Sequence, residues 1–132
     1  AQVLNLFNEL KQDLDLTYLF ISHDLSVVKF VSDVIIVMYL GEMMEMAPAE
    51  MLFKNPLHPY TKALISAIPN TNPTVKKQRI LLNGDIPSAI NPPLGCRFCS
   101  RCFEAREGCE SQHPKLVEVE PNHFVRCFHC GN

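Results

Sequence analysis

All six cysteines of this chain lie between Cys96 and Cys130, with the spacing C-x2-C-x2-C-x6-C-x17-C-x2-C, and residues 1–95 contain none. Between Pro93 and Pro114, the residues from 97 to 112 are mostly charged or small apart from the cysteines. Such a segment cannot build a hydrophobic core of its own, so it needs a metal or cross-links to hold one shape. The cysteine-rich end therefore constrains the fold more than any other feature.

Three kinds of cysteine chemistry fit this pattern. A disulfide framework requires an oxidising compartment, and the N-terminal residues show no secretion signal. A structural zinc site of the zinc-ribbon kind would use two C-x2-C pairs, and three histidines are substitute ligands. The pairs are Cys96 with Cys99 and Cys127 with Cys130, and the histidines are His113, His123 and His129. An iron–sulfur cluster also needs four thiolates, but the C-x3-C-P run of bacterial ferredoxins is absent. Spacing alone favours zinc and leaves the cluster open.

Composition excludes several classes of protein. Among 132 residues, 47% are hydrophobic and 20% are charged, which is typical of a globular chain rather than a disordered one. The formal net charge of −2 argues against a strongly basic nucleic-acid binder, so we expect no nucleic-acid partner. The longest apolar run, 34–40, is too short to span a bilayer. The chain does not begin with Met, which indicates processing or a piece of a longer protein.

Hydrophobic periodicity in the first half predicts alternating helices and strands. In chain order we expect a helix over 2–10, a strand over 16–22, a helix over 25–31, and strands over 34–39 and 42–46 joined by a tight turn. The run 16–22 is apolar at both parities, which is typical of a strand buried on both faces in a parallel sheet. The order predicts an α/β sheet that ends in a hairpin.

Prolines punctuate the second half of the chain. The sequence predicts short helices over 48–53 and 60–67, a polar linker over 70–78 and a short strand over 79–82. We therefore divide the chain into residues 1–69, the linker 70–78, and the cysteine-rich part 79–132.

A histidine and an aspartate, His23 and Asp24, follow the expected strand 16–22 directly. A histidine at the carboxyl end of a strand can donate a hydrogen bond to a phosphate or polarise a water, although it can also simply precede a surface helix. The run 17–25, followed by 34–45, resembles the switch-histidine region of ABC transporter ATPase subunits. The resemblance implies that His23 contacts the γ-phosphate of ATP at a dimer interface.

The stretch 47–64 resembles the C-terminal extension of the oligopeptide and dipeptide branch of this family. The resemblance implies the last part of a mixed-sheet ABC-type nucleotide-binding domain, followed by a small cysteine-rich, metal-binding appendix. It also implies a role in ATP-driven import of oligo- or dipeptides, with a second ABC ATPase subunit and transmembrane permease subunits as partners. The protein would then lie in the cytoplasm, at the inner face of the cell membrane.

Three nucleotide-binding motifs of such ATPases do not occur in these 132 residues. They are the phosphate-cradling G-x-x-x-x-G-K-[ST], the Leu-Ser-Gly-Gly-Gln signature, and four apolar residues followed by Asp-Glu. In the family all three lie upstream of the helix that 2–10 resembles. We therefore expect this chain to correspond to about the last third of a subunit, to be inactive alone, and to meet ATP and Mg only in the full-length parent.

The resemblance extends to the cysteines. Residues 95–102 match Gly-Cys-x-Phe-x-x-Arg-Cys, and 117–127 match a Val-Glu-x-x-Pro-x-His-x-x-x-Cys ending. In the family, such cysteines hold a 4Fe–4S cluster, and the matching positions are Cys96, Cys102, Cys109 and Cys127. Cys99 and Cys130 lie outside that set, so the zinc alternative remains. Two other functions compete with the transporter interpretation. One is a stand-alone metal-binding or redox module, and the other is a zinc-dependent regulatory or nucleic-acid-binding domain.

Overall fold

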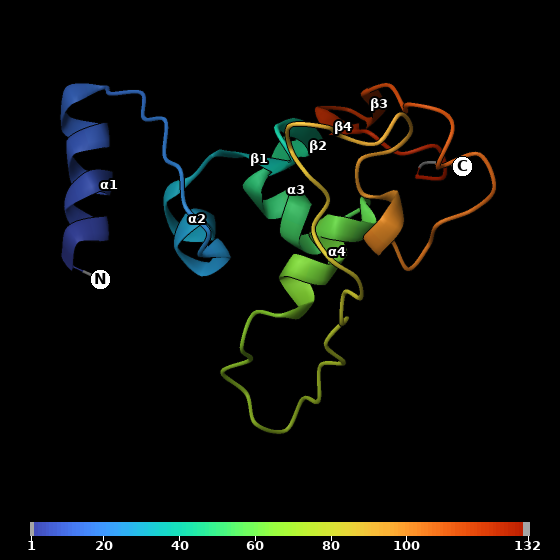
Figure 1. The fold of residues 1–132 in the computed structure, drawn as a ribbon. Helices are drawn as coiled ribbons and strands as arrows, with labels where there is room; N and C mark the ends of the chain where they lie inside the picture. The colour runs from blue at the N-terminus through green and yellow to red at the C-terminus, as the bar shows by residue number, and fades with distance from the viewer. Residues whose placement is uncertain (1, 131–132) are drawn as a thin grey trace.

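The computed structural model describes residues 2–130 as a mixed α/β protein with a four-stranded antiparallel sheet in the order β1-β2-β4-β3 (Figure 1). The elements are α1 (Gln2–Leu14), α2 (Leu25–Val31), β1 (Val34–Tyr39), β2 (Glu42–Pro48), α3 (Ala49–Lys54), α4 (Pro59–Ser66), the 3-10 helix η1 (Cys99–Arg101), β3 (Val117–Glu120) and β4 (His123–Val125). Among the described helices, none combines the length and the apolar character that a bilayer crossing requires.

The β1–β2 hairpin confirms the two strands and the tight turn that the sequence predicts. Leu40 and Gly41 form the turn with φ angles of 48° and 76°, and the flanking residues Tyr39 and Glu42 are paired. Two successive positive φ values match the twist of antiparallel strands, and Gly41 takes such a value without strain. The side chains of β1 alternate between exposed and buried, as a strand with one covered face requires.

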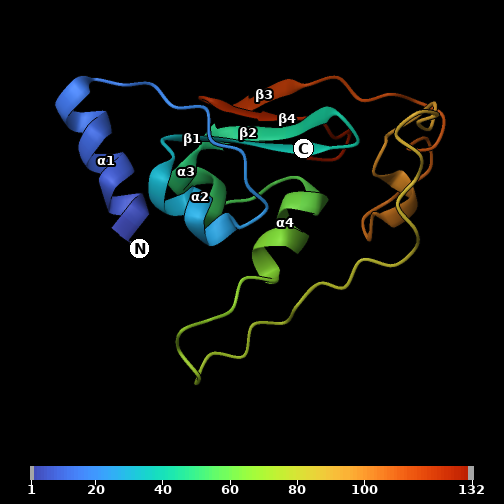
Figure 2. The same ribbon diagram turned by 60° about the vertical axis from the view of Figure 1, so that its left-hand side comes forward.

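Helices cover one face of this hairpin and form the main core. α2 and α3 lie on the same side of the sheet in Figure 2, and α4 follows beside them. The buried cluster between them consists of Val28, Ile35, Val37, Ala47, Ala49 and Leu52. The predicted helices over 25–31, 48–53 and 60–67 are therefore confirmed as α2, α3 and α4, within one or two residues at each end.

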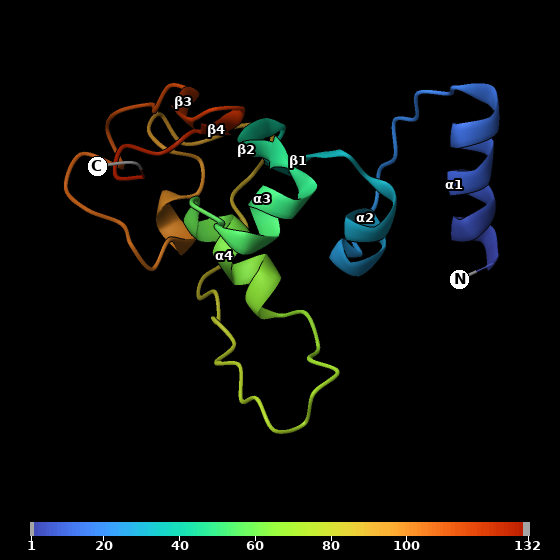
Figure 3. The same cartoon turned by 180° about the vertical axis from the view of Figure 1, so that it is seen from behind.

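Helix α1 runs four residues beyond the predicted end at Leu10, to Leu14. Asp15 ends it instead, since its φ of 51° leaves the helical region. Figures 1 and 3 show α1 at the opposite end of the molecule from β3. It is held by an ion pair between Lys11 and Asp33 and by an edge-to-face contact of Phe7 with Tyr18, whose centroids are 5.9 Å apart.

The predicted buried strand over 16–22 is wrong for this structure. The segment is extended but pairs with no strand among the described residues, and Leu19 and Ile21 are 89% and 88% exposed. A strand that is apolar on both faces needs neighbours at both edges and layers on both faces, and the described chain supplies neither. The described sheet is also antiparallel throughout, not parallel.

The predicted strand over 79–82 is also wrong. This segment is extended without a ladder, and the Ile80 amide donates to Ser66 Oγ at 2.9 Å, next to α4. The sheet is instead completed by β3 and β4, because Met46 of β2 pairs with Phe124 of β4. It thus takes strands from both 1–69 and 79–132, and the division between these parts stays a prediction.

Candidate functional site

A small cavity of about 20 Å³ lies between the start of α4 and the cysteine-rich segments. Five of the six cysteines line it together with two histidines: Cys96, Cys99, Cys102, Cys109, Cys127, His58 and His129. Cysteines that are up to 31 positions apart in the sequence (96 to 127) therefore converge on one place. Such a gathering of soft and imidazole donors makes this cavity the candidate functional site.

The loop 95–109 closes on itself through backbone contacts. The Cys96 amide donates to the Cys109 carbonyl at 2.8 Å. Gly95 is buried against the same carbonyl, and a Cβ at this position would lie 2.4 Å from Cys109 O and from the Glu110 carbonyl carbon. Only glycine permits this close approach, so Gly95 brings the first and fourth cysteines together.

An aromatic cluster fastens this loop to the sheet. Phe98 is fully buried, and its ring centroid is 5.2 Å from those of both Tyr39 in β1 and Tyr60 in α4. Aromatic pairs at such distances contribute about 0.5–1.5 kcal/mol each beyond their buried area. Phe98 stands between Cys96 and Cys99 in sequence, so its burial places both thiols against α4.

Arginines hold both ends of the cysteine-rich part to the β1–β2 hairpin. Arg97 donates to the Leu40 carbonyl in the turn, and its Nε lies 3.4 Å from Glu42 Oε2. Arg126 donates from its backbone amide to Met44 O at 2.8 Å and from Nε to Met43 O at 2.9 Å. Since Arg97 adjoins Cys96 and Arg126 adjoins Cys127, both ligand candidates are anchored by a neighbouring residue.

The thiols around the cavity differ in their acidity. Burial raises the pKa of Cys102 to about 11 and also raises the pKa of Cys96 and Cys99. A hydrogen bond from Cys130 lowers the pKa of Cys127 to about 6, and the same contact raises the pKa of Cys130. The buried thiols must lose a proton before they can ligate a metal.

The two predicted ligand sets differ in how the structure places them. Cys96, Cys102, Cys109 and Cys127 all line the cavity, whereas Cys130 of the zinc set does not, and its Sγ donates to Leu57 O at 3.0 Å. Within residues 2–130, however, no three Cys, His, Asp or Glu side chains are close enough together to hold a metal ion. The donors thus fit a soft metal in chemistry and location, but neither set is assembled.

The three histidines named as substitute zinc ligands have different surroundings. Nε2 of His129 lies 3.6 Å from Cys109 Sγ at the cavity. His113 instead contacts Glu42 Oε1 at 2.9 Å and the Gly95 carbonyl at 3.2 Å. His123 is fully buried and contacts Glu45, away from the cavity lining. Only His129 is therefore placed beside a thiol of the candidate site.

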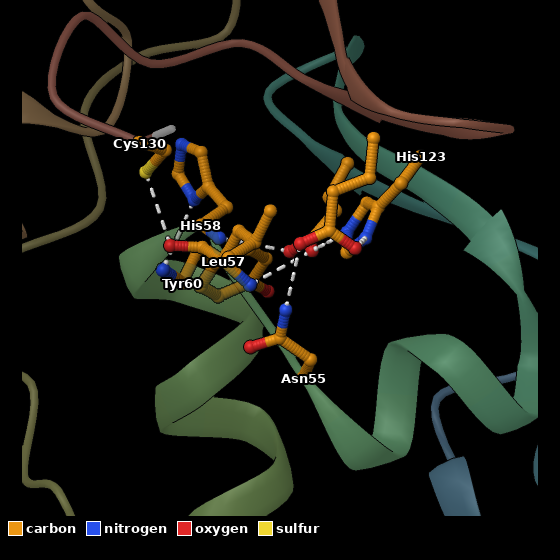
Figure 4. Close-up of polar contacts among 8 residues, drawn as sticks. Asn55, Leu57, His58, Tyr60, His123 and Cys130 are labelled. Atoms are coloured by element: carbon orange, nitrogen blue, oxygen red, sulfur yellow. Dashed lines mark hydrogen bonds and ion pairs between the residues drawn. The ribbon is translucent and has the colours of Figure 1, made fainter. Parts of the chain in front are cut away.

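A buried polar cluster next to the site was not predicted from the sequence (Figure 4). Glu45 accepts hydrogen bonds from the amides of Leu57 and His58, both at 2.9 Å, and from His123 Nε2 at 2.6 Å. These groups come from β2, the start of α4 and β4, so one carboxylate ties three elements together. The available signal was an acidic residue, Glu45, between methionines in the middle of β2, because such a residue is buried only when paired.

His23 lies outside this site. It is exposed in the segment before α2, next to Asp24, which caps that helix. The Asp24 carboxylate accepts from the amides of Ser26 and Val27 at 2.9 and 3.3 Å, which is the usual role of an N-cap aspartate. The position of His23 is therefore defined by a capped helix, and its nucleotide contact stays a prediction.

The sheet, the helices on one face and the attached thiol-lined loop define a mixed α/β protein with a clustered cysteine site. Comparison with protein families then identifies the group. The chain belongs to the family described as "Oligopeptide/dipeptide transporter, C-terminal region", whose model matches residues 44–109. The match runs from β2 through α3 and α4 to the fourth cysteine.

Individual relatives are similar over nearly the whole chain. The "Oligopeptide transport ATP-binding protein AppF" of Bacillus subtilis is 54% identical over 129 residues, 96% of this chain and 39% of that protein. The "Dipeptide transport ATP-binding protein DppF" of Haemophilus influenzae is 50% identical over 129 residues, 98% of this chain and 39% of that protein. A putative peptide import ATP-binding protein of Brucella ovis is 53% identical over 128 residues, 97% of this chain and 40% of that protein. The chain spans about two fifths of the length of these relatives.

Proposed function

We propose that this chain is the C-terminal portion of the ATP-binding subunit of an ABC transporter that imports oligopeptides or dipeptides. The observation that carries the proposal is the 54% identity to an oligopeptide transport ATP-binding protein across 96% of the chain. The complete subunit pairs with a second ATPase subunit at the cytoplasmic face of the membrane and drives a transmembrane permease. Residues 1–69 belong to its nucleotide-binding domain with a helical extension, 70–78 are a linker, and 79–132 are a cysteine-rich C-terminal domain.

In the complete subunit, His23 contacts the γ-phosphate of ATP. Its exposure and its position before the capped start of α2 leave the imidazole free to donate to a phosphate oxygen. Phosphoryl transfer depends on positioning and charge neutralisation, so a fixed donor at this phosphate orients the attacking water and senses the nucleotide. The phosphate cradle and the groups that hold Mg lie outside these 132 residues.

The test is a His23→Ala substitution in the full-length protein. Loss of a contact made in the transition state typically lowers turnover by about 10²–10³-fold, and we expect a loss in that range without a change of fold. Lys76→Ala, at an exposed residue of the linker, is the matched control and should leave turnover unchanged. Unchanged ATPase activity in His23→Ala would remove this histidine from the nucleotide site.

The 132-residue chain alone should neither bind nor hydrolyse ATP appreciably, since it has no phosphate-binding loop. Isothermal titration calorimetry with Mg-ATP measures this directly. A dissociation constant in the micromolar range would contradict the proposal, because such binding requires a phosphate cradle, and the 132 residues contain no G-x-x-x-x-G-K-[ST] motif.

We further propose that Cys96, Cys102, Cys109 and Cys127 hold a 4Fe–4S cluster with a structural role. Their common location at one cavity supports this proposal. When bound, such a cluster cross-links segments that are too polar to form a core, and its binding energy becomes folding energy. Zinc held by Cys96, Cys99, Cys127 and Cys130 is the alternative centre.

Metal analysis and single substitutions separate the two centres. Anaerobically prepared protein should contain iron and acid-labile sulfide and absorb in the visible range. Changing Cys102 or Cys109 to Ser should abolish the cluster, whereas Cys99→Ser and Cys130→Ser should retain it. If Cys99 and Cys130 are indispensable while Cys102 and Cys109 are not, the zinc centre is correct.

The thiol-lined cavity also favours a second function, a stand-alone metal-binding or redox module without an ATP role. Amino-terminal sequencing of the native protein separates the two. A native chain that begins at Ala1 would contradict the ATPase proposal for this molecule and favour the module.

A further inference from the structure

A second cavity, of about 260 Å³, is distinct from the thiol-lined one and lies between the end of α4 and the segment that follows the linker. Its walls are Ala63, Leu64 and Ala67 at the end of α4, the segment 79–82, and Arg101 at the end of η1. Among the described residues, no cysteine, histidine or carboxylate lines it. Small-molecule pockets measure about 300–1,000 Å³, so this space suits a ligand near the lower end of that range.

Two contacts hold the segment 79–82 beside the helix. The Ile80 amide donates to Ser66 Oγ in the last turn of α4 at 2.9 Å. Leu82 packs against the buried aromatic cluster around Phe98. Both anchors belong to the chain itself, so the cavity is present before a ligand binds. A ligand therefore does not have to order this segment, which lowers the cost of binding.

The guanidinium group of Arg101 contains an unsatisfied donor in this cavity. Its Nε is removed from solvent and has no hydrogen-bond partner among the described residues. Arg101 also takes part in no ion pair within residues 2–130. A buried donor without an acceptor is costly, and burial of a charged group costs more still unless the group is paired. The acceptor that this cavity lacks is therefore an anion.

The two arginines of the cavity lie toward opposite ends of the segment 79–82. Arg79 is exposed and adjoins Ile80, which is bound to the last turn of α4. Arg101 lies near Gly84, since a Cβ at Gly84 would be 4.0 Å from Arg101 Cγ. The carbonyl end of a helix attracts cations and repels anions, so the charge of Arg79 complements the end of α4. An anion is therefore favoured at Arg101, with the apolar part of the ligand along the helix.

We propose that this cavity binds a small aliphatic monocarboxylate, which accepts a hydrogen bond from Arg101 Nε and lays its hydrocarbon chain against the end of α4. The planar guanidinium group matches a carboxylate in shape and charge. A phosphate group brings more charge and a third oxygen, and the lining side chains supply no hydroxyl, amide or lysine for them. An amino acid or peptide brings an ammonium group, for which the lining supplies no carboxylate.

The experiment titrates the ¹⁵N-labelled 132-residue chain with octanoate and follows it by NMR. The Arg101 Nε–H signal and the amide signals of 63–67 and 79–82 should shift together, with a dissociation constant of about 1 mM or tighter. Octanol has the same chain length without the charge. It should bind at least about tenfold more weakly, because it loses the charge-assisted hydrogen bond. Phosphatidylglycerol vesicles, which present an anionic lipid surface, should leave these signals unchanged.

Three variants locate the site. Arg101→Gln should weaken octanoate binding at least about tenfold and leave octanol binding unchanged. Its matched control is Arg106→Gln, at an exposed arginine of the same loop that does not line the cavity, and this variant should bind octanoate as the wild type does. Ala67→Leu, at an exposed position of the cavity wall, should weaken the binding of both ligands, because the larger side chain fills the space.

Several results would overturn the proposal. They are absence of octanoate binding, equal binding of octanoate and octanol, and undiminished octanoate binding in Arg101→Gln. Shifts confined to the exposed apolar residues Leu19 and Ile21 would place the ligand elsewhere. An Arg101-dependent response to the vesicles without a response to octanoate would make this surface a membrane contact instead. Circular dichroism checks the fold of each variant, and if Arg101→Gln is unfolded, the octanol comparison and Ala67→Leu decide.

Discussion

The carboxylate of Glu45 and the imidazole of His123 contact each other at 2.6 Å, from Oε1 to Nε2, with both side chains fully removed from solvent. Glu45 belongs to β2, and His123 begins β4, so the pair joins the hairpin near the N-terminus to the one after the cysteine loop. The remaining acceptor capacity of Glu45 is used by the amides at the start of α4. The pair is therefore a fully buried polar link between the helical part and the cysteine-rich part.

Replacing Glu45 by Ala should destabilise the chain strongly. The substitution leaves the His123 imidazole and the Leu57 and His58 amides buried without their partner. Each buried donor that is left without an acceptor typically costs about 1–3 kcal/mol of unfolding free energy, and this substitution removes the acceptor of three donors. Urea unfolding followed by circular dichroism measures the change.

The matched control for Glu45→Ala is Glu107→Ala, which removes an exposed carboxylate. Substitutions at such surface positions usually change the unfolding free energy by less than about 0.5 kcal/mol. Equal effects of the two substitutions would show that Glu45 does not link these elements.

Local patterns predicted the elements that depend on neighbours close in sequence. The hairpin of Tyr39 and Glu42 and the helix capped by Asp24 follow from turn chemistry and periodicity within a few residues. The same patterns failed at 16–22 and 79–82, where β-forming residues find no strand to pair with in the described chain. A strand is fixed by its partners, and sequence periodicity does not identify them.

For the candidate site, too, sequence patterns predicted some features and missed others. Cysteine spacing predicted that the thiols act together, and five of them do line one cavity. It could not predict that Cys130 turns to the Leu57 carbonyl, or that Glu45 reaches His123 across 78 positions. Both contacts join segments that only the folded chain brings together.

Acid should destabilise the metal-free chain through His58. Burial lowers the pKa of His58 from 6.5 to about 4, and its Nδ1 accepts from the Tyr60 amide at 3.0 Å as the N-cap of α4. As the pH falls, the His58 imidazole is protonated in the unfolded chain before it is protonated in the folded chain. The contribution of neutral His58 to the unfolding free energy is therefore fully present above pH 6.5 and is lost as the pH falls toward 4. At about 1.4 kcal/mol for each pKa unit, the loss reaches roughly 3 kcal/mol.

Other groups titrate in this range, so the wild-type curve must be compared with that of a His58→Gln variant. Glutamine offers a side-chain oxygen to the helix start and carries no titratable proton. Urea unfolding between pH 4 and pH 7 should show a shallower pH dependence for His58→Gln. If the unfolding free energies of the two proteins depend on pH in the same way, the lowered pKa of His58 and its cause, burial, are contradicted.

A Gly95→Ala substitution should open the cysteine loop. The added Cβ would lie 2.4 Å from Cys109 O, so the backbone must move and the Cys96 amide loses its acceptor. Overpacking of this kind typically costs about 1–3 kcal/mol, and we expect a matching loss of stability together with faster reaction of Cys109 with a thiol reagent. Ser100→Ala, at an exposed position of the same loop, is the control, and thiol reaction rates that match between the two variants would contradict this account.

Limited proteolysis with a nonspecific protease should cut first within 70–78. This stretch is exposed throughout and contains no helix or strand, so it enters a protease site without unfolding the rest of the chain. The two fragments should nevertheless elute together in gel filtration, because the β2–β4 pairing, the Glu45–His123 contact and the packing of Phe98 against Tyr39 all cross the cut. In the Glu45→Ala variant the fragments should separate more readily.

First cleavage inside 34–46 would mean that the hairpin is not formed. Separation of the wild-type fragments would mean that these contacts do not hold the two parts together.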